Sequence, residues 1–151
     1  MKLLSSTETK IRSVLKSFRE RTGTSYTSIF NEDGLIIAVD QATPNSDEDF
    51  DLSLGAISAS ILAFAQNGIS MINAMHNVKN LTIQAGQEIE DESFIVIIES
   101  IGYEATLMSI FPSVLNRSVI LFELKQISQK LLKIFETDDI NESSTRISTM
   151  I

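Results

Sequence analysis

The stretch LSLGAISASILAFAQNGISMINAM, residues 52–75, contains no charged residue. Charged residues make up 21% of the chain, so a segment of this length is expected to hold about five of them. Its apolar residues recur at the spacing of an α-helix. The pattern predicts a long helix whose surroundings differ from those of an ordinary surface helix, and either lipid or protein could provide them.

A membrane span is the first explanation, because about 20 apolar residues suffice to cross a bilayer. The segment also contains polar side chains, which are costly in lipid. They lie at Ser53, Ser58, Ser60, Gln66, Asn67, Ser70 and Asn73. Burial by protein is therefore the preferred explanation for the missing charges.

A helical wheel divides this helix into two kinds of face. A bulky stripe is expected to lie on the sheet of its own subunit, and it comprises Leu54, Ile57, Ile61, Phe64, Met71 and Met75, widened by Leu62, Ala65 and Ile69. The far side comprises small or uncharged residues: Ala56, Ala59, Ala63, Gln66, Ser70 and Asn73. Small residues let another backbone approach closely, so this side is predicted to be a dimer or docking face. The alternatives are a plain exposed surface and a surface covered by the acidic loop.

The residues before the long helix predict a first helix and a β-hairpin. Capping-box spacing at Ser5 and a helical apolar repeat predict a helix over residues 7–22. Two β-rich runs, residues 26–30 and 35–39, flank a short turn. Gly34 in that turn supplies the positive φ that a tight hairpin requires.

Three strands and a final helix are expected after the long helix. Residues 81–85 alternate between polar and apolar, as a half-buried edge strand does, and this strand is a second predicted interface. Residues 94–98 are apolar throughout and are interpreted as the central strand, while residues 105–111 end at Pro112. The final helix shows an apolar stripe at Ile120, Leu124, Ile127, Leu131 and Ile134. A stripe this short is typical of a core-facing helix, with a coiled coil as the alternative.

These elements predict one α/β (α+β) domain, residues 1–137, with a polar C-terminal tail, residues 138–151, that frays. Its fold would be a five-stranded antiparallel sheet in the order α-β-β-α-β-β-β-α, with the long helix on one face and the terminal helices on the other. The acidic loop over residues 40–51 is expected to be exposed and mobile.

Composition narrows the classes of partner. The chain has 151 residues, no cysteine and a net charge of −8, which fits a reducing cytoplasm and disfavours nucleic acid and anionic membranes as partners. The N-terminus has no apolar stretch long enough for the core of a signal peptide. A cytoplasmic location without direct membrane insertion is therefore expected.

The sequence offers no catalytic or cofactor-binding pattern. Its six glycines are too far apart for phosphate-binding loops, and His76 is the only histidine. The acids at residues 47–51 lack the spacing of a calcium loop. The serines have no identifiable base to activate them. We therefore expect no cofactor, no metal and no enzymatic activity.

The order of elements and two local motifs resemble the roadblock/dynein light chain (longin-like) family. The motifs are the hairpin segment DGLIIA, residues 33–38, and the small-residue helix with Gly55, Ala56, Ala59 and Ala63, and the resemblance covers about residues 7–135. It implies a homodimer or heterodimer in which the third strands pair and the second helices lie side by side. It also implies partners, namely Ras-like small GTPases or larger motor and signalling scaffolds.

The sequence is therefore interpreted as a non-enzymatic dimeric scaffold or adaptor that regulates a Ras-like small GTPase. The expected dimer or partner interface comprises Ala56, Ala59, Ser60, Ala63, Gln66, Asn67, Ser70, Asn73, Leu81 and Ile83. One alternative is a PAS- or profilin-like sensor, which predicts a ligand pocket. A passive light-chain-type assembly subunit is the other.

Overall fold

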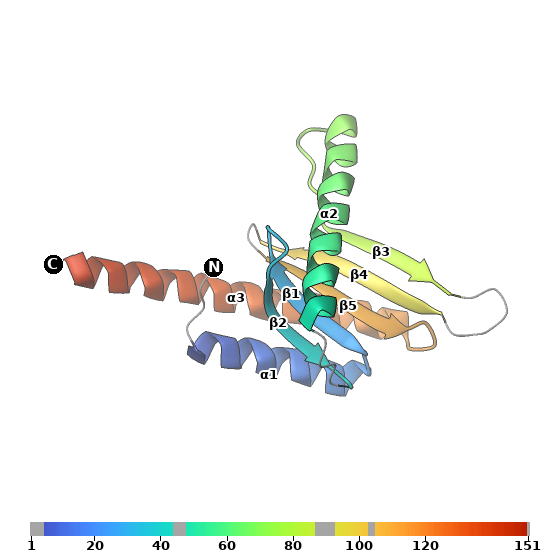
Figure 1. Cartoon of the computed structure of the whole chain (residues 1–151), viewed down its shortest axis with the longest axis horizontal. Coiled ribbons are helices and arrows are strands. Elements are labelled where there is room, and N and C mark those ends of the chain that lie inside the picture. The colour runs from blue at the N-terminus through green and yellow to red at the C-terminus, as the bar shows by residue number, and fades with distance from the viewer. Residues whose placement is uncertain (1–4, 44–47, 87–92, 103–104, 151) are drawn as a thin grey trace.

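The computed structural model describes residues 5–43, 48–86, 93–102 and 105–150. Its elements are α1 (Ser5–Thr22), β1 (Tyr26–Asn31), β2 (Ile36–Gln41), α2 (Glu48–Ile72), β3 (Asn80–Ala85), β4 (Phe94–Ile101), β5 (Ala105–Pro112) and α3 (Arg117–Met150). The strands form one antiparallel sheet in the order β2-β1-β5-β4-β3. Helix α2 crosses one face of the sheet, and α1 and α3 cover the other (Figure 1). This is the predicted fold class.

The larger of two apolar cores lies between the sheet and helices α1 and α3. Ile29 of β1 and Leu107 of β5 are fully buried there against the inward faces of both helices. The apolar stripe of the final helix belongs to this core, as the sequence predicted. A hydrogen bond of 2.8 Å from Thr7 to Asp138 links the two helices.

The smaller core lies beneath α2. Tyr26, Phe30, Ile98 and Met108 are buried at its centre, and α2 contributes Leu54, Ala59 and Leu62 from above. The Tyr26 hydroxyl donates a 2.9 Å hydrogen bond to Asp51 in the first turns of α2. Burial first, and then this hydrogen bond, raise the pKa of Tyr26, so the phenol stays protonated. Tyr26 thus fastens the N-terminal end of α2 to the sheet.

Two glycines fix how closely α2 approaches the hairpin. Gly34 has a φ of 82°, the left-handed conformation predicted for the turn. A Cβ added at Gly55 would lie 2.5 Å from the carbonyl oxygen of Gly34, which is backbone and cannot turn aside. Only glycine at residue 55 therefore allows this contact between helix and turn.

Several expectations about the elements were wrong. The central strand is β5, not the apolar run at residues 94–98, because β4 pairs with the edge strand β3. Helix α2 begins at Glu48, so acids expected in a mobile loop lie in its first turn, where the helix dipole favours negative charge. Helix α3 extends to Met150, into the polar segment predicted as a C-terminal tail, and the expectation that this tail frays stays a prediction.

Replacing Gly55 by alanine should lower the free energy of unfolding by about 2 kcal/mol, because the new methyl group must push α2 away from the Gly34 carbonyl. Urea denaturation followed by circular dichroism measures this change. Gly68→Ala is the matched control, since no atom lies within 4 Å of its added Cβ. Alanine is the better helix former, so the control should gain about 1 kcal/mol. Equal effects at both positions would contradict the close contact.

Candidate interaction surface on helix α2 and strand β3

Leu54 and Leu62 of α2 pack on the smaller core, as the sequence predicted, but most other large side chains of the predicted stripe do not lie on the sheet. Phe64 is 83% exposed, Met71 is 89% exposed, and Ile57, Ile72 and Met75 are also exposed. The sheet-facing side of the helix consists of small residues and two leucines: Leu54, Gly55, Ser58, Ala59 and Leu62. The Gly55 contact explains the difference, because it turns the small residues inward and the bulky stripe to one side.

The predicted interface residues on α2 have three different environments. Six are exposed: Ala56, Ser60, Ala63, Asn67, Ser70 and Asn73. Ala59 instead packs on the smaller core. Gln66 holds the chain that follows the helix, since its amide donates to the His76 carbonyl at 3.1 Å and accepts from the Val78 amide at 2.7 Å. No residue pattern indicated this role for Gln66.

Strand β3 is an edge strand, as its alternating sequence indicated. It pairs with β4 on one side only, so its other edge has no strand beside it in the chain that the structure describes. Leu81 and Ile83 are half-buried, while Thr82 and Gln84 are exposed. An open edge can pair with a strand of another chain.

Helix α2 has an exposed apolar flank, which comprises Ile57, Phe64, Met71 and Ile72 together with Met75 just beyond the helix. The sequence pattern had placed Ile57, Phe64, Met71 and Met75 on the sheet instead. Soluble domains rarely leave so many large apolar side chains uncovered together. The C-terminal half of α2 also projects past the sheet, beyond β3 (Figure 1). The flank and the open β3 edge are thus both available to a second chain.

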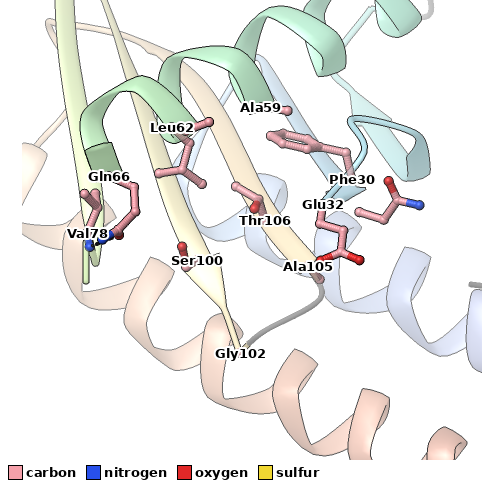
Figure 2. Close-up of a pocket in the computed structure, with 12 residues that line it drawn as sticks. Phe30, Glu32, Ala59, Leu62, Gln66, Val78, Ser100, Gly102, Ala105 and Thr106 are labelled. Atoms are coloured by element: carbon pink, nitrogen blue, oxygen red, sulfur yellow. Dashed lines mark hydrogen bonds between the residues drawn. The ribbon is translucent and has the colours of Figure 1, made fainter. Parts of the chain in front are cut away.

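A cleft of about 240 Å³ lies between α2 and the sheet (Figure 2). Phe30, Leu62 and Val78 form its apolar walls. Thr106 is only 7% exposed and lines it, yet its hydroxyl makes no hydrogen bond to any other described residue. Ser100, its partner across β4 and β5, lines the cleft beside it, also without a side-chain hydrogen bond to a described residue. The cleft therefore combines apolar walls with two hydroxyls that form no side-chain hydrogen bond to the described residues.

The described residues contain no grouping of side chains that could hold a metal ion. No three His, Asp or Glu side chains there are close enough to share a metal ion. His76 is exposed beyond the end of α2. The polar contacts of this surface are suited to binding and positioning.

By length and composition alone, α2 is long and apolar enough to cross a membrane. An 18-residue window within Asp49–Ile72 has a mean hydropathy of 1.4, and only 11% of that window is buried. The same helix is hydrogen-bonded and packed onto its own sheet through Tyr26 and the smaller core. A partner protein explains the exposed flank without removing α2 from that packing.

No protein-family model matches the chain, and no curated protein matches it. Solved structures do match. The gliding protein MglB from Thermus thermophilus superposes with a TM-score of 0.75 at 18% identity, over 89% of this chain and 95% of that one. Myxococcus xanthus MglB gives 0.72 at 21% identity, over 85% and 97% of the two chains. A Roadblock/LC7 domain from Streptomyces avermitilis gives 0.71 at 12% identity, over 83% and 97%.

At these identities the likeness establishes the fold. The chain has the α+β fold of roadblock-type proteins, so the resemblance inferred from its sequence is confirmed at that level. MglB and the Roadblock/LC7 domain are the named proteins with which it shares that fold.

Proposed function

We propose that this protein is a non-enzymatic dimeric scaffold or adaptor that binds and regulates a Ras-like small GTPase. The observation that carries the proposal is the exposure of large apolar side chains on α2, in a molecule whose edge strand β3 is also open. The roadblock-type fold supports it, because the family that the sequence resembles forms dimers that bind such GTPases. A cytoplasmic location is part of the proposal.

The energetics favour association through the α2 flank. Fully burying one large apolar side chain contributes about 1.5–3 kcal/mol. Phe64, Met71 and Ile72 are each more than four-fifths exposed, so most of that energy is unused in the lone chain. A second copy that adds its β3 to the sheet would bring its own α2 alongside and cover both flanks. The exposed small residues Ala56 and Ala63 would then let a GTPase approach the helix pair.

Substitution of Phe64 by glutamate tests the dimer. The charged side chain should raise the dimer dissociation constant at least about tenfold, because a carboxylate would have to be desolvated at the interface. Size-exclusion chromatography with light scattering measures the mass of each species, 16.7 kDa for one chain. Val114→Glu is the matched control, since Val114 is 81% exposed in the turn between β5 and α3. A wild-type chain that stays monomeric at high concentration would refute the proposed dimer.

A nucleotide-state pull-down tests the GTPase partner. Ras-like GTPases from the same cell, loaded with GDP or with a non-hydrolysable GTP analogue, should bind in one state at least about tenfold more tightly, because a regulator acts through different affinities for two states. Ala63→Glu should weaken this binding. Equal binding to both states would instead indicate a passive light-chain-type subunit, and no binding to either would contradict the proposal.

A ligand-binding sensor is the second candidate, and the cleft beneath α2 is the observation that favours it. A small molecule that fills the cleft and bonds to Thr106 should raise the melting temperature of the protein. Thr106→Val keeps the shape of the side chain but removes the hydroxyl, so it should weaken the best ligand of a screen about tenfold. Thr82→Val, on an exposed strand position, is the control. A screen without thermal shifts would count against a sensor.

A further inference from the structure

Charge is distributed very unevenly between the faces of this acidic protein. Helix α1 and residues 117–138 of α3 together contain nine of the twelve basic residues but only five of the twenty acids. These two segments carry a net charge of +4, and the rest of the chain therefore carries −12. Both helices lie on the side of the sheet opposite α2 (Figure 1).

Several cations on this helical face are unpaired. Salt bridges join Arg12 to Glu8, Arg19 to Asp40 and Arg21 to Glu123, and a long contact joins Lys16 to Glu20. Five others are exposed and make no ion pair to any described residue: Lys10, Arg117, Lys125, Lys130 and Lys133. Free cations on the surface of a chain of net charge −8 indicate attraction to an external anion.

Large apolar side chains lie among these cations on α3. Phe122 is 61% exposed, and Val119, Leu121 and Leu132 are exposed as well. Phe122 precedes Lys125 by three residues and Lys133 by eleven, so the three side chains share one outer row of the helix. A row of lysines interleaved with apolar residues is the pattern of helices that lie at a lipid–water interface.

We propose that the α1/α3 face, defined by the five unpaired cations with Phe122, Leu121 and Leu132, binds an anionic phospholipid surface. Charge complementarity selects the anion. The exposed phenylalanine and leucines favour a bilayer over a purely polar polyanion, because they can enter the boundary between headgroups and acyl chains while lysines stay in the headgroup layer. The contact is peripheral, and no segment crosses the membrane.

The net charge of −8 does not prevent this contact. Screening at physiological salt limits electrostatic reach to about 8 Å, and a single helix is about 10 Å thick. Acids beyond the sheet are therefore largely screened from a surface that touches α3. Docking by this face would leave α2 and its apolar flank turned away from the lipid, free to bind a partner, although the lipid contact does not depend on the proposed dimer.

Co-sedimentation of the full chain with vesicles tests this proposal. Vesicles of phosphatidylcholine with phosphatidylserine should bind the protein at low salt, and both pure phosphatidylcholine and high salt should abolish binding. Each lysine near an anionic surface contributes about fivefold in affinity, so the pair Lys125→Glu and Lys133→Glu should weaken binding about 20-fold or more. Phe122→Ser should weaken it about tenfold.

Matched variants separate the α1/α3 face from other causes. Lys79→Glu changes the net charge as Lys133→Glu does but lies just before β3, and it should leave binding unchanged. Leu35→Ser, at a 57% exposed apolar position in the turn between β1 and β2, is the control for Phe122→Ser and should also leave vesicle binding unchanged. A loss of binding in Leu35→Ser equal to that in Phe122→Ser would overturn the proposal. Circular dichroism confirms that each variant is folded.

Three further results would overturn it: no binding that depends on phosphatidylserine, equal losses in Lys79→Glu and Lys133→Glu, or binding to a labelled oligonucleotide without binding to vesicles. The last result would identify the face as a site for a polyanion. Because this assay needs no GTPase and no dimer, its failure is distinguishable from failure of the proposed function.

Discussion

The contact between Gly55 of α2 and the carbonyl of Gly34 determines how the rest of this molecule is presented. It brings helix backbone against turn backbone, and a side chain at either position would separate them. With the helix held there, and with Tyr26 bonded to Asp51 at its start, the rotation of α2 about its own axis is fixed. Gly55, Ser58 and Leu62 consequently face the sheet, and the bulky flank faces outward.

Much of the fold could be predicted from the sequence, because the spacing of apolar residues indicates which side of a helix or strand is buried. The hairpin around Gly34, the edge strand at residues 81–85 and the core stripe of α3 all have one face in a core and one outside. Strand order was harder. Residues 94–98 are as apolar as a central strand, but β5 is central because each of its neighbours, β1 and β4, pairs with a further strand, which a local pattern does not encode.

The face of α2 was mispredicted for a physical reason. Phe64 and Met71 are more hydrophobic than Gly55 and Ser58, so a helical wheel predicts that the larger residues face the sheet. In the folded chain small residues face the sheet instead, because only a small residue lets α2 approach Gly34 so closely. The absence of charge at residues 52–75 correctly marked the whole helix as unusual. The side of α2 that stays exposed could not be deduced without knowing where the hairpin turn lies.

The net charge of the protein likewise does not show where its charged residues lie in the fold. A net value of −8 describes the field far from the molecule, whereas a docked surface responds to charges within about one Debye length. The fold gathers α1 and residues 117–138 of α3 into one layer on one side of the sheet, and these two segments contain nine of the twelve basic residues. Apolar exposure on α2 and basic exposure on α3 thus lie on opposite sides of one sheet. A chain built this way can contact two unlike partners at once, because neither surface is needed to hold the other in place.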